Sequence, residues 1–193
     1  LDTLASQGPI HATADFLRAR LAQVFPPNRF QHELLAAPLT PQTVGRLANV
    51  RALVVGLAFL GLRPAAQTGR AMQATQRWGL YLLTRAPAAA PRLLGDAQAP
   101  GLAELVHAAI IGLHGWTVAG ERDAGAGTIA MGEGEAADAA LWNDQQGALW
   151  SASLDIAATF AAPGPDTLQR LAQEWSFAGA TPFTTDTLTL EGR

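Results

Sequence analysis

Apolar residues recur at helical spacing in two long segments of the chain. In residues 12–25 they fall on one face of a helix that Pro26-Pro27 would end, and the stripe consists of Ala14, Leu17, Leu21 and Val24. A second stripe predicts a helix over residues 102–115 and consists of Leu102, Leu105, Val106, Ala109, Ile110 and Leu113. Thr40-Pro41 is typical of a helix start, so a short helix is expected over residues 41–49.

Three other segments have the pattern of strands. Residues 51–60 (RALVVGLAFL) are almost continuously apolar and short, which is typical of a buried strand. Residues 76–85 (QRWGLYLLTR) alternate, with Trp78, Leu80 and Leu82 on one face. Residues 61–70 hold Pro64 and no helical pattern, so we expect a loop there and antiparallel pairing of the two strands. Residues 149–160 also alternate and predict a half-buried strand.

The remaining segments predict mostly irregular structure. Residues 28–38 show no pattern, and residues 86–101 are rich in Pro, Ala and Gly, so loops are expected in both. Residues 120–138 are Gly-rich and acidic, which predicts a loop or long hairpin with a short strand near residues 128–131. Beyond Pro163, a capping-box spacing at Asp166 and Gln169 predicts one short helix, and residues 181–193 alternate like a strand.

Together these elements predict an α+β fold, in which a small, mostly antiparallel sheet packs with two main helices. The 193 residues are enough for one hydrophobic core, so we expect a single domain over residues 1–162 and a C-terminal extension over residues 163–193. The longest apolar run, residues 52–62, is about half of the roughly 20 residues that span a bilayer, so no membrane segment is expected.

Composition narrows the chemistry that is open to the chain. It contains no Cys and no Lys, which excludes disulfides, cysteine nucleophiles, Cys-ligated zinc, lysine Schiff bases and Walker-type phosphate loops. The net charge of −3 conceals two opposed halves: residues 1–100 hold ten Arg and four acidic residues, whereas residues 101–193 hold three Arg and twelve. Such asymmetry is consistent with docking inside the chain or with copies that meet head to tail.

Motifs for catalysis or cofactor binding are weak. Residues 125–130 (GAGTIA) have the spelling of a dinucleotide loop, but an acidic segment precedes them where a hydrophobic strand is required. Glu104 and His107 have a carboxylate-bridged metal spacing, yet such sites need two copies of the motif and the chain has one. His107 and His114 lie seven residues apart on one helical flank and could share a ligand, but a structural or surface role is favoured for both. We therefore expect no catalytic residue, no metal and no cofactor, and do not expect an enzyme.

Four segments, in their order and spacing, resemble a family of Mu-like bacteriophage and prophage tail proteins related to tail terminators. They are residues 58–61 (AFLG), 76–85 (QRWGLYLLTR), 110–116 (IIGLHGW) and the strand at 148–160. The resemblance covers residues 12–162 and implies a structural virion protein, a tail completion protein at the head-proximal end of the tail. It implies a homo-oligomeric ring, commonly a hexamer, that caps the tail tube, contacts the tail tube protein and the head–tail connector protein, and is assembled in the host cytoplasm.

A head-to-tail ring needs two complementary patches on each subunit. Candidate basic interface residues are Arg63, Arg70 and Arg77, and candidate acidic ones are Glu133, Glu135 and Asp138. The acidic group has a second interpretation, in which it faces the lumen and keeps passing DNA from binding. A head–tail joining (neck) protein and a non-viral binding module of the same fold remain alternatives.

Overall fold

The computed structural model describes residues 8–35, 40–50, 53–68, 71–118, 127–136 and 147–161. The chain divides into two compact units, Leu1–Ala161 and Ala162–Arg193, and every described residue belongs to the first. This first unit has an α+β fold with a mostly antiparallel sheet, which confirms the predicted fold class. The helix and strand predicted beyond Pro163 lie outside the described residues.

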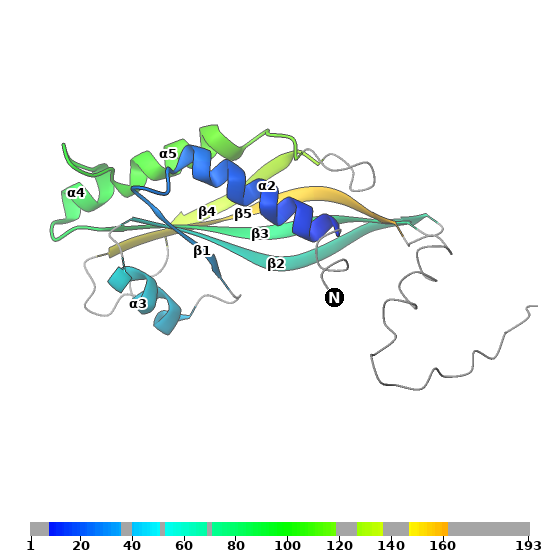
Figure 1. The fold of residues 1–193 in the computed structure, drawn as a ribbon, viewed down its shortest axis with the longest axis horizontal. Coiled ribbons are helices and arrows are strands. Elements are labelled where there is room, and N and C mark those ends of the chain that lie inside the picture. Colours follow the sequence, from blue (N-terminus) through cyan, green and yellow to red (C-terminus); the bar gives the residue numbers. More distant parts are fainter. Residues whose placement is uncertain are drawn as a thin grey trace, which may run out of the picture. The chain divides into compact units, whose positions relative to one another are not determined.

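The sheet has five strands in the order β1-β2-β3-β5-β4 (Figure 1). They are β1 (Gln31–Leu35), β2 (Leu53–Thr68), β3 (Ala71–Arg85), β4 (Ile129–Ala136) and β5 (Gly147–Ala161). β1 runs parallel to β2, and all other neighbouring pairs are antiparallel. The predicted antiparallel pairing of residues 51–60 with residues 76–85 is confirmed, with Leu57 opposite Leu80.

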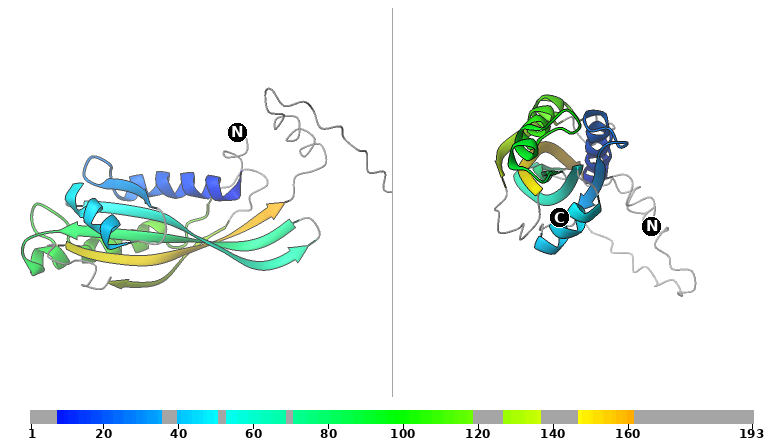
Figure 2. Two further views of the ribbon diagram at one scale, coloured as in Figure 1. Left: turned by 90° about the horizontal axis from the view of Figure 1, so that it is seen from below. Right: turned by 90° about the vertical axis from the view of Figure 1, so that its left-hand side faces the viewer.

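Helices lie on both sides of this sheet. α2 (Pro9–Val24), α4 (Ala89–Leu94) and α5 (Leu102–Leu113) lie on one side, and α3 (Pro41–Val50) lies on the other (Figures 1 and 2). The predicted helices over residues 12–25, 41–49 and 102–115 are thereby confirmed, with small differences at their ends.

Strand alternation divides the core between the two faces. On β3, Trp78, Leu80 and Leu82 are fully buried in the cluster under α2 and α5, whereas Leu83 joins a smaller cluster with Leu47 of α3. The alternation predicted for β3 is therefore confirmed. Each fully buried Leu contributes about 1.5–3 kcal/mol to the free energy of unfolding, so the larger cluster provides most of the hydrophobic stabilisation.

A buried polar network ties the start of α2 to the sheet. Gln76 of β3 has no exposed surface; its Nε2 donates to Thr13 Oγ1 at 3.1 Å and to the Pro9 carbonyl at 3.2 Å. Its Oε1 accepts a hydrogen bond from Trp78 Nε1 at 3.2 Å. Thr13 Oγ1 in turn donates to the Pro9 carbonyl at 2.8 Å. The network gives each of these buried side chains a hydrogen-bond partner within the protein, in place of water.

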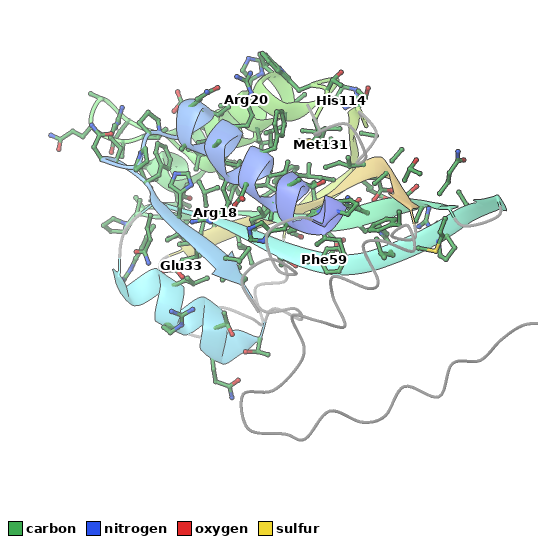
Figure 3. The ribbon with its side chains drawn as sticks, turned by 45° about the vertical axis from the view of Figure 1, so that its right-hand side comes forward. Arg18, Arg20, Glu33, Phe59, His114 and Met131 are labelled. Atoms are coloured by element: carbon green, nitrogen blue, oxygen red, sulfur yellow. The ribbon has the colours of Figure 1, made fainter. Side chains whose placement is uncertain are left out.

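A second polar contact joins α2 to the C-terminal end of α5. Arg20 Nε donates to the Gly112 carbonyl at 2.9 Å, which satisfies one of the last carbonyls of α5. The same guanidinium lies 3.5 Å from the ring centroid of Trp116, in a cation–π contact (Figure 3 labels Arg20). The two helices are thus held side by side over the sheet.

Two predicted loops are wrong on the β1–β2 side of the molecule. Residues 28–38 were expected to be irregular, but Gln31–Leu35 form β1. Residues 61–70 were expected to be a loop, but β2 continues to Thr68 and pairs with β3 along its whole length. Pro64 is tolerated there because the pairing register shifts between Pro64 and Ala66, where a missing N–H donor disturbs the ladder least.

Two further loops contain regular structure. Residues 86–101 include the short helix α4, which has six residues. The short strand expected near residues 128–131 extends to Ala136, so part of the predicted acidic loop is an edge strand. The strand expected over residues 149–160 is confirmed as β5, with Leu154 and Ile156 buried under the helices and Ser153 and Asp155 on the opposite face.

Candidate functional site

The structure describes four of the six candidate interface residues. Arg63 is exposed on β2, Arg77 is half-buried on β3, and Glu133 and Glu135 are exposed on β4. Arg70 and Asp138 lie outside the described residues. The four belong to different parts of the sheet, the basic pair to its middle strands and the acidic pair to an edge strand.

The two arginines share a face of the β2–β3 hairpin. The strand register places Gly61 opposite Arg77 and Arg63 opposite Thr75, so the two arginines are diagonal neighbours. Arg77 also has a partner in its own chain, since its Nε lies 3.4 Å from Asp155 Oδ1 across the β3–β5 pair. Both atoms are shielded from solvent and make no hydrogen bond, so the contact is electrostatic. Arg63 is therefore the more available of the two for a partner.

A polar strip surrounds this ion pair on the face of the sheet opposite α2 and α5. Ser151 and Ser153 of β5 stand opposite Tyr81 and Gly79 of β3. The Tyr81 ring lies across Gly79, where an added Cβ would come within 2.9 Å of the phenol oxygen. Partial burial of the ring raises the pKa of the Tyr81 hydroxyl above its usual 10.0. The strip thus combines the Arg77–Asp155 ion pair with two serines and the half-buried Tyr81 ring, which packs against the cluster under α3.

The β2–β3 hairpin, together with the end of β5, forms an arm that continues beyond the helix layer (Figures 1 and 2). Leu60 and Leu62 on this arm are about two-fifths exposed, and Arg63 beside them is also exposed. Pro64 and Gln73 at the same level are exposed as well. The arm thus presents apolar side chains to solvent on a rigid, hydrogen-bonded ribbon.

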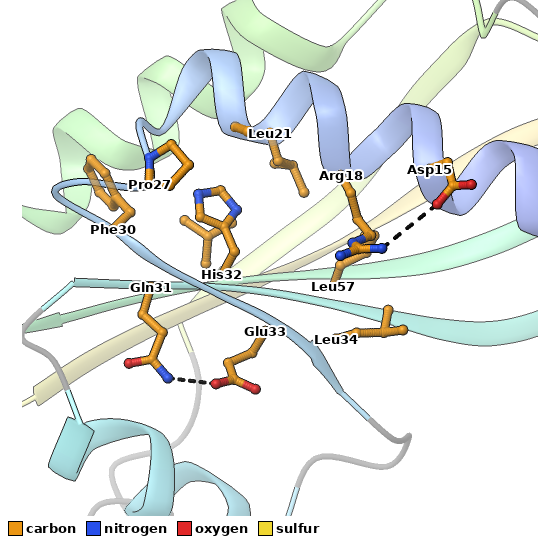
Figure 4. A pocket seen from close by; sticks show the side chains of 12 residues that line it. Asp15, Arg18, Leu21, Pro27, Phe30, Gln31, His32, Glu33, Leu34 and Leu57 are labelled. Carbon is orange, nitrogen blue, oxygen red and sulfur yellow. Dashed lines mark hydrogen bonds and ion pairs between the residues drawn. The ribbon is translucent and has the colours of Figure 1, made fainter.

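A groove of about 730 Å³ lies between α2 and β1 (Figure 4). Its apolar floor includes Leu21, Val55 and Leu57, and its rim carries charged side chains from both elements. Arg18 Nη1 lies 3.7 Å from Asp15 Oδ1 on the α2 rim, an exposed pair that contributes little to stability. On the β1 rim, Gln31 Nε2 donates to Glu33 Oε1 at 2.6 Å, and His32 Nε2 is hydrogen-bonded to the Phe25 carbonyl at 2.7 Å.

The histidines and the Gly-rich motif have local structural contacts instead of a common site. Glu104 Oε2 accepts a hydrogen bond from the Gly101 N–H at 3.2 Å and thus caps α5. His114 Nδ1 accepts a hydrogen bond from the Met131 N–H at 3.2 Å (Figure 3). In the part of the chain that the structure describes, no three His, Asp or Glu side chains are grouped to hold a metal ion. Gly127 precedes strand β4, whereas a dinucleotide loop would lead into a helix.

The groove and the edge strand β1 were not found from the sequence. Gln31–Leu35 is only five residues long, consists of three polar residues followed by two leucines without alternation, and pairs with β2 in parallel, far from any hairpin signal. The sequence therefore offers no signal for it, and the 61% exposure of Leu34 appears only in the folded structure.

Comparison with known proteins does not identify a family for this chain. No protein-family model matches the sequence, and the search of curated proteins finds no match. No helix in the described ranges has the length and apolar character needed to cross a membrane.

Proposed function

We propose that this chain is a structural subunit of a bacteriophage or prophage tail, a terminator that forms a ring on the finished tail tube and links it to the head connector. The observation that carries the proposal is the β2–β3–β5 arm, which extends beyond the helices with Leu60, Leu62 and Arg63 exposed. Apolar side chains exposed on such an arm are typical of a surface that a neighbouring subunit covers.

The rest of the described surface agrees with an assembly role. The polar strip around Arg77 and Asp155 lies on the sheet face opposite α2 and α5, and the two edge strands, β1 and β4, are different surfaces, as a ring subunit that binds its neighbours head to tail requires. The resemblance of residues 58–61, 76–85, 110–116 and 148–160 to Mu-like tail proteins supports the specific place in the virion.

The proposal is tested by electron microscopy of tails made with and without this chain. Tails that grow beyond their normal length without it would support a terminator. Normal-length tails that fail to join heads would instead assign it to the neck, and normal, infectious particles would refute both roles.

A variant of the arm tests the observation itself. Leu60→Asp with Leu62→Asp places two charges on side chains that are already partly exposed, so the fold should survive while ring formation and tail completion are lost. The matched control is Ala97→Asp with Gln98→Asp, which adds the same two charges to the exposed turn after α4. If the arm variant completes tails as well as the control does, the arm is not an assembly surface.

A further inference from the structure

The two edges of the sheet differ in charge and in shape. β1 and β4 are the outermost strands, and Figure 2 (right) shows α2, β1 and α3 on one side of the molecule and α5 and β4 on the other. β1 itself carries Glu33 and no arginine, but the exposed Arg18 of α2 lines the groove beside it and the exposed Arg29 lies two residues before it in the chain. The β4 strand carries Glu133 and Glu135 and no basic residue.

We propose that the β4 edge of one copy docks on the β1 edge of the next, so that the sheet continues from subunit to subunit. The inference rests on the proposed self-assembly and names the surfaces that would close the ring. The contact is heterologous, because the β4 edge of each copy binds the β1 edge of the next copy. When the rotation between successive copies divides a full turn evenly, such contacts form a closed ring.

The backbone of β4 is available over a defined length. At its start, the outer edge is already covered: Ile129 N–H donates to the Trp116 carbonyl at 2.8 Å, and Met131 N–H donates to His114 Nδ1 at 3.2 Å. Within the described ranges no backbone partner covers residues 132–136, and all five are exposed. The pairing of β4 with β5 shifts register between Met131 and Gly134, so the regularly paired stretch of this free edge is Gly134–Ala136, against five residues in β1.

Strand directions allow the two edges to pair. β1 is parallel to β2, β2 is antiparallel to β3, β3 is antiparallel to β5, and β4 is antiparallel to β5. β1 and β4 therefore run in opposite directions, and a sheet that continues across copies would join them as an antiparallel pair. Main-chain hydrogen bonds would then supply affinity, as in other cases where a strand adds to a sheet edge.

Apolar groups on the helix side of the sheet complement each other as well. On the β4 side, Ile110 and Ile111 of α5 are about half or more exposed. On the β1 side, the groove between α2 and β1 has an apolar floor that includes Leu57, and Leu34 at its lip is 61% exposed. Edge pairing brings the α5 of one copy next to the β1 edge of its neighbour, where these isoleucines would cover Leu34, since the floor of the groove is already buried.

Glutamates on a free edge strand normally protect it from pairing with other sheets. Here they restrict the choice of partner, because Glu133 and Glu135 repel another β4 edge and would attract Arg18 and Arg29, which flank β1. The same charges explain why the β4 edge would not pair with itself in a two-fold dimer.

Engineered cysteines test this contact cleanly, because the chain has no cysteine of its own. Leu34 and Ala136 both lie on the α2 and α5 face of the sheet. In the full-length chain, Leu34→Cys combined with Ala136→Cys should therefore give a ladder of disulfide-linked multimers on a non-reducing gel, up to the number of subunits in the ring. Either single variant should give no linked dimer, because like edges do not meet. The control pair, Leu34→Cys with Ala97→Cys, should give no ladder.

Charge reversal provides a second, independent measurement. Glu133→Arg with Glu135→Arg should weaken self-association about tenfold or more, and adding Arg18→Glu and Arg29→Glu to the same chain should restore it. Rings that form normally while the cysteine pair gives no ladder would overturn the edge contact and leave the proposed function standing. A wild-type chain that stays monomeric at high concentration and on tail tubes would overturn both.

Discussion

Gln76→Leu removes the polar side chain at the centre of the contact between α2 and the sheet while nearly preserving its volume. Gln76 has no exposed surface, and Trp78, whose Nε1 donates to Gln76 Oε1, is 2% exposed. The substitution leaves the Trp78 N–H buried without an acceptor. Thr13 Oγ1 keeps its bond to the Pro9 carbonyl at 2.8 Å, so the helix-side groups remain paired.

The expected loss follows from that single orphaned donor. An unsatisfied buried N–H costs about 1–3 kcal/mol, so the free energy of unfolding should fall by this amount. In a domain of this size the melting temperature should fall by roughly 2–4 °C for each kcal/mol. Urea unfolding followed by far-ultraviolet circular dichroism measures the loss without relying on the fluorescence of Trp78 itself.

A double-mutant cycle separates the hydrogen bond from packing. Trp78→Phe removes the N–H together with part of the ring, so Gln76→Leu should cost about 1–3 kcal/mol less in that background than in the wild-type chain. Equal costs of Gln76→Leu in the two backgrounds would refute the reasoning, because the bond to Trp78 would then contribute nothing to stability.

Three further predictions concern other contacts of the described core. Arg20→Ala should lower the free energy of unfolding by about 1–2 kcal/mol, because it removes the contacts of Arg20 with Gly112 and Trp116. Arg18→Ala on the same helix is the control and should change the free energy of unfolding by less than about 0.5 kcal/mol, since it removes only an exposed ion pair. Thermal melts of both variants measure the difference. Tyr81 is the only tyrosine, so ultraviolet absorbance reports its ionisation directly, and the folded chain should form phenolate only above pH 10.0. Because folding raises the pKa of Tyr81, the free energy of unfolding should fall as the pH rises from 10.0 through the raised value. A titration midpoint of Tyr81 at or below pH 10.0 would contradict burial of the ring. Gly101→Ala should cost about 1–3 kcal/mol in chemical unfolding, since its Cβ would lie 2.1 Å from the Gly95 backbone nitrogen.

The sequence predicts those elements in which apolar residues recur regularly because one face is buried. Apolar residues of β3 alternate with the other residues, and those of α5 recur at helical spacing, because one face of each element lies in the core. The arm end of β2 has no such face: Leu62, Arg63 and Pro64 are all exposed, so no alternation distinguishes this strand from a loop. Its pairing with β3 is a long-range property that appears only in the folded hairpin.

The sequence predicts the opposed charges of the candidate interface, but it does not predict where the fold places them. The excess of Arg in residues 1–100 and of acidic residues in residues 101–193 is plain from the sequence. What the sequence does not show is that the first half supplies one outer strand, β1, and the second half supplies the other, β4.

This topology gives the charge asymmetry a spatial meaning. If the chain had placed β4 beside β1, the opposed charges would have paired within one subunit and left nothing for a neighbour. Because β2, β3 and β5 separate the two edges, the strand beside β4 is β5, which carries no arginine. Arg18 and Arg29 flank the opposite edge, so under the proposed edge contact they would face the acidic edge of another copy.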